Sequence, residues 1–380
     1  MLRKFLAAHL ALMSFLSLSA QAPSSEYNDG GAVPDSAASI ATDQKDASKP
    51  GWQLTGSADV YYRYDFNRQA ANNKTSFTNS TNSFELGMAS LCVSHSAGKA
   101  SAIIDLGFGK RAEEFSYNDK NTQFIIKQLN LSYSILKDLK LTAGSWATHI
   151  GYELVDATAN RNYSMSYMFS YGPFFHTGIK AEYAKGKSHF MLGIADPTDF
   201  KSALAGSKKF LIGQYCYSGE DQKLKAYFNF QEGKRVADTA RFFQTDIVMT
   251  YKLSDKFNLG YNGTLTEIGF RKYSDEKDYD PYKSWWGSAL YFNYDPKDIL
   301  GFTLRTEYFS DKNSLVLFGA YPDGGNILAS TFSANIRKDA LTIIPEIRFE
   351  QSNQPLYIKK DGITGTKTDF SALIAAVYRF

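Results

Sequence analysis

The sequence predicts an all-β protein, a single transmembrane antiparallel up-and-down β-barrel of about 16 strands with short periplasmic turns and long extracellular loops. Three observations support this fold class: an export signal, a series of stretches in which apolar and polar residues alternate, and connections that alternate in length. Aromatic residues make up 15% of the chain, and they are enriched in strands because they pack well on a pleated surface.

The composition excludes several other classes. Hydrophobic residues are 43% and charged residues 21% of the chain, which is typical neither of a disordered chain nor of a helical membrane protein. Without Arg3 and Lys4 of the export signal, 40 basic residues stand against 39 acidic ones, a net charge of +1 that gives no support for binding nucleic acid. The two cysteines exclude a disulfide scaffold and a four-cysteine zinc site.

Residues 1–22 have the pattern of a signal peptide. Arg3 and Lys4 form its basic region, residues 5–18 are mostly apolar, and Ala20-Gln21-Ala22 is a small-residue cleavage site. The mature protein is therefore expected to be exported.

Residues 23–50 differ from everything that follows. They are rich in Ser, Ala, Asp and Pro and show no apolar periodicity, so they predict a flexible periplasmic tail. A short docking peptide is the alternative. Residues 51–380 are expected to form the outer-membrane barrel.

The alternation is clear in residues 298–308. Phe302 and Leu304 fall on one face, and Arg305 and Glu307 fall on the other. The expected strands are 52–66, 83–95, 99–109, 124–134, 139–149, 173–184, 187–195, 207–218, 221–231, 242–253, 256–270, 284–294, 299–309, 327–338, 341–351 and 369–380.

The connections alternate between tight turns and long loops. The long loops are 67–82, 110–123, 150–172, 196–206, 232–241, 271–283, 310–326 and 352–368. A strand of about eleven residues, rising about 3.4 Å per residue and tilted by about 45°, spans roughly 26 Å, which matches the lipid-facing band of an outer-membrane barrel. A soluble sandwich or jelly roll is the alternative, but it does not require loops that alternate so regularly.

The last predicted strand, residues 370–380, supports the same location. It ends on Phe380, with Tyr378 two residues earlier. This ending resembles the terminal strand that outer-membrane proteins present to the barrel-assembly machinery.

The polar faces of the strands supply the candidate pore-lining residues. They are Arg63, Lys180, Glu182, Lys223, Lys225, Asp246, Arg305, Glu307, Glu346 and Arg348. Both signs are present, so the sequence indicates no preference for cations or anions, and each residue is more often a solvated or mutually paired wall residue than a solute contact.

The longest predicted loop, residues 150–172, follows the fifth strand and is the candidate constriction. Glu153, Asp156 and Arg161 could set a transverse field there if the loop folds inward. The interpretation favoured by the sequence is simpler: Gly172 begins the return to the wall, and the loop packs against the rim. Residues 163–171 could also extend the sixth strand.

The amino-acid sequence of this region resembles that of a known family. The resemblance is carried by residues 151–153, 160–164 and 169, and above all by Gly172, Pro173, Phe174, His176, Thr177 and Gly178. The chain is similar to the OmpL-like outer-membrane β-barrel porins (beta-barrel porin type 2), and the family's domain would cover about residues 51–380. The resemblance implies an outer-membrane channel of poorly defined substrate, and it brings no catalytic residues.

Enzyme motifs are lacking in the sequence. His149 and His176 flank the third loop and could approach each other, but no third ligand or nucleophile is indicated, and there is no HExxH or GxSxG. We therefore expect no enzyme, no cofactor and no metal, and a porin for small hydrophilic solutes. The alternatives are a hydrolase on the barrel rim and an adhesion or assembly partner that acts through extracellular loops.

The expected surroundings follow from a barrel in the outer membrane of a Gram-negative cell. The partners are membrane lipid, lipopolysaccharide, small polar solutes and the barrel-assembly machinery, with no nucleic acid. A homotrimer is left open, because it requires a flat apolar wall that the sequence alone does not identify.

Overall fold

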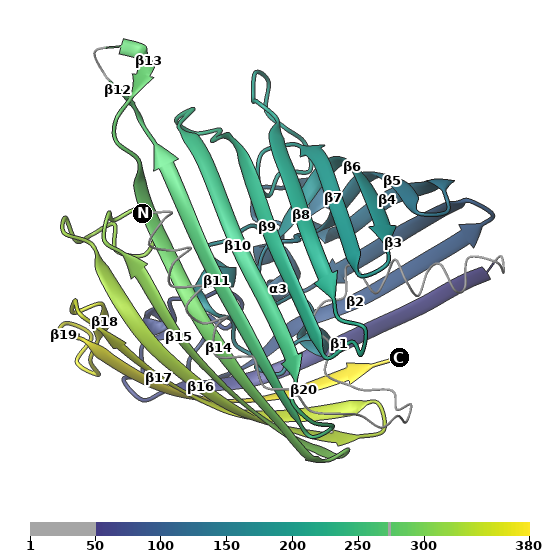
Figure 1. The fold of residues 1–380 in the computed structure, drawn as a ribbon. Helices are drawn as coiled ribbons and strands as arrows, with labels where there is room; N and C mark the ends of the chain where they lie inside the picture. The colour runs from purple at the N-terminus through teal and green to yellow at the C-terminus, as the bar shows by residue number, and fades with distance from the viewer. Residues whose placement is uncertain (1–50, 273–274) are drawn as a thin grey trace. The chain divides into compact units, whose positions relative to one another are not determined.

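The alternating stretches form a closed antiparallel barrel of sixteen strands (Figure 1). The structure is a computed structural model that describes residues 51–272 and 275–380. The predicted signal peptide (1–22) and tail (23–50) lie outside the described residues. In the described ranges, no helix is long and apolar enough to cross a membrane.

Each strand pairs with its neighbours in sequence order, and the last strand returns to the first. The first eight strands are β1 (Gly51–Asp65), β2 (Ser83–Ala97), β3 (Ala100–Phe108), β4 (Ile126–Leu136), β5 (Leu139–Ala147), β6 (Phe175–Lys185), β7 (Ser188–Ala195) and β8 (Phe210–Ser218). The other eight are β9 (Leu224–Lys234), β10 (Arg241–Lys252), β11 (Phe257–Gly269), β14 (Lys283–Lys297), β15 (Leu300–Asp311), β16 (Gly325–Lys338), β17 (Leu341–Ser352) and β20 (Thr368–Arg379). The predicted fold class and strand number are confirmed.

The two faces of each strand meet different surroundings. On β15, Arg305 and Glu307 are 0% and 1% exposed, whereas Leu304, directly before Arg305, is 38% exposed. The same alternation continues around the wall, so the apolar side chains point outward and the charged ones inward. This is the inversion of a soluble core that is typical of an outer-membrane barrel.

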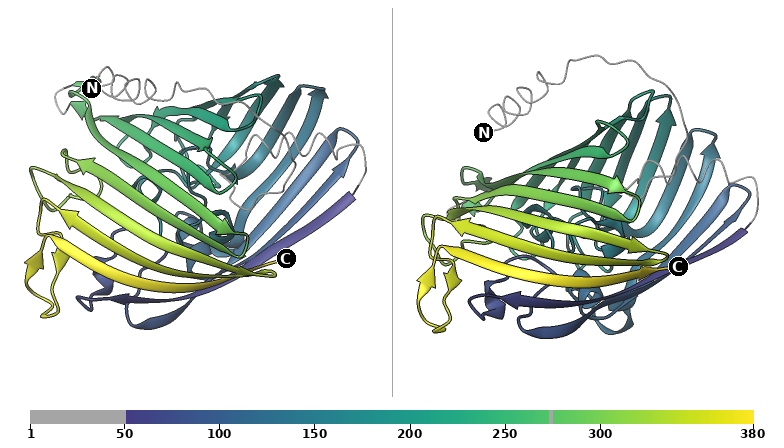
Figure 2. Two further views of the ribbon diagram at one scale, coloured as in Figure 1. Left: turned by 60° about the horizontal axis from the view of Figure 1, so that its bottom comes forward. Right: turned by 90° about the horizontal axis from the view of Figure 1, so that it is seen from below.

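The connections have the predicted asymmetry. Short turns such as 98–99, 137–138 and 186–187 lie at one rim, and the long connections lie at the other. The long connections carry η1 (Ala70–Asn72), α3 (Lys110–Phe115), η2 (Asn121–Ile125), η3 (Ala157–Ala159), α4 (Tyr167–Ser170) and two small hairpins, β12 (Arg271–Lys272) with β13 (Asp275–Tyr279) and β18 (Tyr357–Ile358) with β19 (Gly365–Thr366). Figure 2 shows the tilted strands from two further sides.

A pair of glycines lets four neighbouring strands, β4 to β7, come together where the longest loop leaves the wall. Gly144 on β5 has φ +125°, and a Cβ there would lie 2.2 Å from the carbonyl oxygen of Leu129. Gly178 on β6 lies directly opposite Gly144, and a Cβ there would lie 2.1 Å from the carbonyl oxygen of Ile194. Only glycine fits Gly144 without backbone movement, because its φ is in the region that side chains disfavour.

Replacing Gly144 with valine is therefore expected to destabilise the barrel by about 2–4 kcal/mol, because it combines a disfavoured φ with a backbone clash. The midpoint of urea unfolding, followed by the loss of the heat-modifiable band on a gel, measures the effect. The control is Ala143→Val, whose side chain is exposed on the outer face. Equal midpoints for the two variants would contradict the assignment.

Candidate channel constriction

The connection between β5 and β6, residues 148–174, is named the inward loop here because it crosses the barrel interior. Its ends are joined, since the Thr148 backbone N–H donates to the Phe174 carbonyl oxygen at 3.0 Å. Between these ends the loop contacts side chains of β10, β15, β17 and β1, each of which is four or more strands away from both β5 and β6. The loop therefore does more than pack against the rim, and the simpler interpretation of the sequence was wrong.

The first part of the loop is fixed to the wall at β10 and β14. The Gly151 N–H donates to Oδ1 of Asp246 at 3.0 Å, and the Tyr152 ring stacks on that of Tyr291 with centroids 3.9 Å apart. Asp246 also accepts hydrogen bonds from Asn229, Asn262 and Thr264. A fully buried carboxylate with so many donors is satisfied without water.

A group of five charged residues, the central ion network, holds the middle of the loop. Its members are Glu153 of the loop, Arg305 and Glu307 of β15, and Arg348 and Glu350 of β17. Nη1 of Arg305 lies 2.5 Å from Oε1 of Glu153, and Nη2 of Arg348 lies 2.9 Å from Oε1 of Glu350. All five side chains are at most 4% exposed, so each charge depends on its partners.

Wall charges also pair with the backbone of the loop. Glu346 accepts from the N–H groups of Tyr163 and Ser164 at 2.8 and 3.2 Å, and Glu307 accepts from the N–H of Tyr167 at 2.7 Å. Arg348 donates to the Met165 carbonyl oxygen at 3.0 Å. A segment without strand partners thus has its polar groups satisfied by ionised side chains.

The far side of the loop reaches β1, β4 and α3. The Tyr163 hydroxyl donates to Asp59 of β1, and the guanidinium of Arg111 lies 4.6 Å from the centroid of the Tyr163 ring. Nζ of Lys127 on β4 lies 2.5 Å from Asp156 of the loop and 3.2 Å from Asp105 of β3. The loop is therefore fixed on opposite walls.

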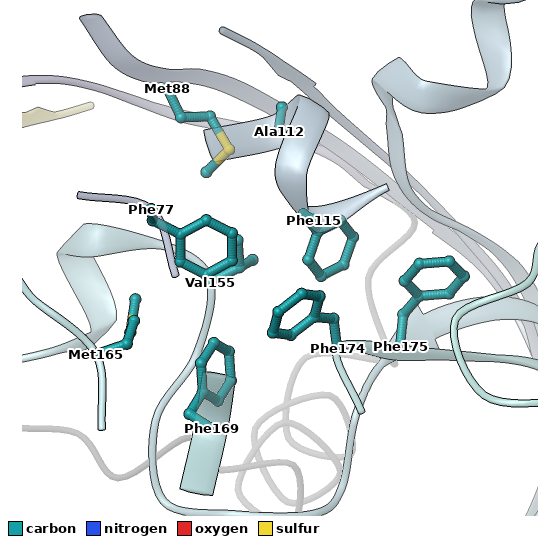
Figure 3. Close-up of a cluster of buried hydrophobic side chains, with 9 residues drawn as sticks. All are labelled: Phe77, Met88, Ala112, Phe115, Val155, Met165, Phe169, Phe174 and Phe175. Atoms are coloured by element: carbon teal, nitrogen blue, oxygen red, sulfur yellow. The ribbon is translucent and has the colours of Figure 1, made fainter. Parts of the chain in front are cut away.

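Apolar packing completes the attachment at the end of the barrel with the long loops. Figure 3 shows the phenylalanine cluster, in which the inward loop meets α3, β2 and the loop 66–82. Its members, each at most 5% exposed, are Phe77, Met88, Ala112, Phe115, Val155, Met165, Phe169, Phe174 and Phe175. Within the loop, Ser166 caps α4 by accepting from the Phe169 N–H at 3.2 Å, so residues 163–171 do not extend β6.

The candidate loop charges are separated by the structure. Glu153 is buried in the central ion network, Asp156 pairs with Lys127, and Arg161 pairs with Asp295 of β14. They therefore do not form one opposed pair across an opening. Their role at a constriction stays a prediction.

The candidate pore-lining residues differ in their surroundings. Those on the inward face of the strands are Arg63, Lys180, Glu182, Lys225, Asp246, Arg305, Glu307, Glu346 and Arg348. Lys223 directly precedes β9, which begins at Leu224; it is 40% exposed and its Nζ lies 3.6 Å from Asp221. Whether the inward residues contact a solute stays a prediction, although Arg305, Glu307 and Arg348 contact the loop instead of open lumen.

The residues of the family motif position the return of the loop. The N–H groups of Phe174 and Phe175 donate to Oδ1 of Asp199 at 2.7 and 3.0 Å, and the Thr177 carbonyl accepts from the Asp196 N–H at 2.7 Å. Sequence reasoning missed Asp199, and it missed the role of Arg111, because each acts on a distant loop. The only signal in the sequence that could have indicated their roles is a charged residue in a loop near aromatic residues.

His149 and His176 do approach each other, with ring centroids 4.9 Å apart. Nε2 of His149 faces the Phe230 carbonyl oxygen at 3.2 Å, and Nε2 of His176 faces the Thr148 hydroxyl at 3.1 Å. Burial lowers the pKa of His149 to about 4, so this ring is neutral near pH 7. Among the described residues, no group of three or more His, Cys, Asp or Glu is placed to hold a metal ion.

A barrel of this size whose interior is crossed by a loop is the architecture of an outer-membrane porin. The model of the family described as "Putative beta-barrel porin-2, OmpL-like" matches residues 51–380. The chain belongs to this family of outer-membrane porins. No curated protein sequence is significantly similar to the chain.

Solved structures share the fold at low sequence identity. The outer-membrane channel DcaP of Acinetobacter baumannii has a TM-score of 0.59 and 11% identity, over 88% of this chain and 98% of DcaP. An anion-selective porin from Comamonas acidovorans has a TM-score of 0.56 and 11% identity, over 87% and 100% of the two chains. The trimer form of OmpT from Vibrio cholerae has a TM-score of 0.55 and 10% identity, over 87% and 99%.

Removing the cation at the centre of the network tests the attachment of the loop. Arg305→Ala leaves Glu153 buried without its closest partner, which is expected to cost about 3–5 kcal/mol and to loosen the loop. Limited trypsin digestion of the folded protein, read by mass spectrometry, should then show cleavage after Arg161 that the wild type resists.

The control is Lys187→Ala, which removes an exposed pair with Glu220 at the opposite rim. Surface pairs of this kind contribute little to stability, so cleavage after Arg161 should not change. An Arg305→Ala protein as resistant as the wild type would show that the network does not hold the loop.

Proposed function

We propose that the barrel forms a water-filled channel for diffusion of small hydrophilic solutes, and that the inward loop sets its narrowest part. The observation that carries this proposal is the attachment of one loop to opposite walls, through Glu153 to Arg305 of β15 and through Asp156 to Lys127 of β4. Barrels of sixteen strands leave an aqueous channel when their interior is not filled. A loop across such an interior reduces the open cross-section to what lies beside it.

The same contacts favour a fixed constriction over a moving lid. Glu153 and Arg305 are 4% and 0% exposed, and separating a buried pair leaves an uncompensated charge. The apolar Phe169 and Phe174 of the phenylalanine cluster would also be exposed by such a movement. Passage is therefore set by size and charge beside a stationary loop.

The surroundings of the barrel follow from its outer face. Leu131 and Leu192 are 65% and 57% exposed, which suits contact with lipid, and the long loops would meet lipopolysaccharide. Phe380 pairs through its backbone with Gly56 on β1 at 2.9 and 3.0 Å. We propose that this terminal segment is the part that the assembly machinery binds before the barrel closes.

A homotrimer is supported by the uneven height of the wall. β3, β5, β7 and β8 have 9, 9, 8 and 9 residues, whereas β14 to β17 have 12 to 15 residues. Tilted by about 45°, eight or nine residues span only about 19–22 Å, less than the lipid-facing band of about 25 Å. Packing this short wall against other copies removes the mismatch with the bilayer.

Deleting residues 153–168 tests the constriction. Single-channel conductance of the refolded protein in a planar bilayer should rise about twofold or more, because the lumen loses its crossing segment. The control is a shorter deletion, of 272–278 in the hairpin that projects from the rim (Figure 1), which should leave conductance unchanged. Equal conductance for the 153–168 deletion and the wild type would contradict a constriction by this loop, and a folded wild type without steps would contradict the channel.

Substitution on the short wall tests the trimer. Leu131→Trp on β4 should dissociate trimers in detergent, because a larger ring cannot fit a packed interface. Leu304→Trp on the tall wall should not, because tryptophan is tolerated in lipid. Light scattering after size-exclusion chromatography measures the mass of the protein in detergent. A wild type that is already monomeric would contradict the proposed trimer.

A further inference from the structure

The described lumen separates its charges by exposure. Six of the carboxylates that fix the inward loop or the wall around it are buried: Asp59, Glu153, Asp246, Glu307, Glu346 and Glu350 are at most 5% exposed. They accept hydrogen bonds from backbone N–H groups, hydroxyls, amides or guanidinium groups. A mobile cation would have to displace these donors to reach them, so these charges attract little from solution.

Two clusters with more cations than carboxylates remain partly open to the lumen. In the first, Glu182 lies 3.1 Å from Nζ of Lys180 and 3.7 Å from Nζ of Lys140, and the two lysines are 14% and 21% exposed. Lys180 also lies 5.0 Å from the ring centroid of Trp146. The two lysines share a single carboxylate, that of Glu182, so the cluster keeps an excess positive charge.

The second cluster joins the inward loop to the wall. Asp295 of β14 pairs with Arg161 of the loop and, at 3.1 Å, with Arg337 of β16. The two arginines are 15% and 25% exposed, and Nη1 of Arg161 has no hydrogen-bond acceptor in the described part of the chain. This cluster also keeps an excess positive charge.

The clusters face each other across the lumen. β5 and β6 are the fifth and sixth strands of the closed order, and β14 and β16 are the twelfth and fourteenth, so by the shorter way round they are six to eight strand positions apart, close to half of the sixteen-strand ring. Lys140, Asp295 and Arg337 lie within three residues of the strand ends that meet the short turns. A solute leaving the constriction toward this rim passes between the two clusters.

Among the partly exposed clusters of the described wall, one has more carboxylates than cations. Lys127 serves both Asp105 and Asp156, and Asp156 is 26% exposed. This cluster lies near the ends of β3 and β4 that meet the long loops. Lys140 and Arg337 lie near the opposite end of the barrel, next to the short turns. The charges are therefore separated along the axis, and the segment next to the short turns is the positive one.

We propose that the channel prefers small anions, and that Lys140, Lys180, Arg161 and Arg337 create this preference. The inference rests on the proposed channel function and adds its substrate class. Positive groups on opposite sides of a narrow, low-dielectric passage raise the local concentration of anions and exclude cations. The effect should weaken with salt, because the screening length falls from about 10 Å at 0.1 M to about 3 Å at 1 M.

The test is the reversal potential of the full mature protein in a planar bilayer under a potassium chloride gradient near 0.1 M. The wild type should show a permeability for chloride about threefold or more above that for potassium, and the ratio should fall as both salt concentrations are raised. A reversal potential of zero, or one of the cation-selective sign, in a conducting wild type would overturn the anion preference alone. Absence of conductance in the folded wild type would overturn the proposed function and this inference together.

Variants assign the preference to the clusters. Lys140→Gln with Arg161→Gln leaves each carboxylate one cation, so the permeability ratio should fall to about one. Glu182→Gln should raise the ratio, a change of opposite sign that misfolding cannot imitate. Lys209→Gln with Lys359→Gln, on exposed loops outside the barrel, is the charge-matched control, and an equal fall in this control would overturn the assignment.

Discussion

A chain segment inside a barrel must satisfy its backbone N–H and C=O groups without strand partners, and this requirement shapes the interior of the protein. The solution is ionic: Glu346 and Glu307 accept from loop N–H groups, while Arg305 and Arg348 donate to loop carbonyls. Charged partners give stronger hydrogen bonds than neutral ones. The wall and loop therefore depend on each other, since either alone would leave buried charges without partners.

This arrangement also explains why so many charges face inward while few are available to solutes. Acidic residues are used where backbone N–H groups need acceptors, and those residues are desolvated. Basic residues such as Lys140 and Arg337 share single carboxylates nearer the short turns and stay partly exposed. The inward face of the wall thus binds the loop through buried acidic residues and, nearer the short turns, presents partly exposed basic residues to the lumen.

Much of the fold could be predicted from the sequence, because a barrel strand has a period of two, which is visible in residues 302–305, where Phe302 and Leu304 alternate with Thr303 and Arg305. The central ion network could not be predicted from the sequence. The alternation shows that Arg305 faces inward, but its partner Glu153 is 152 positions away, and nothing local specifies that pairing. The start of β9 was also hard to predict, because the alternation of the sequence continues past Leu224 to Lys223 without a break. The need for glycine at positions 144 and 178 likewise depends on contacts among four strands, β4 to β7, that only the fold brings together.

The attachment of the inward loop has a consequence for the order of assembly. Its partners on β15 and β17 are about 140 to 180 positions later in the chain. Its partner Asp59 on β1, by contrast, is 104 positions earlier. Contacts of such long range form late, because the intervening chain must first be ordered. The loop can therefore complete its contacts only after the last strands are in place. Docking of the loop then acts as a final step that couples closure of the seam between β1 and β20 to narrowing of the passage, so an incompletely closed barrel would be a wider leak in the membrane.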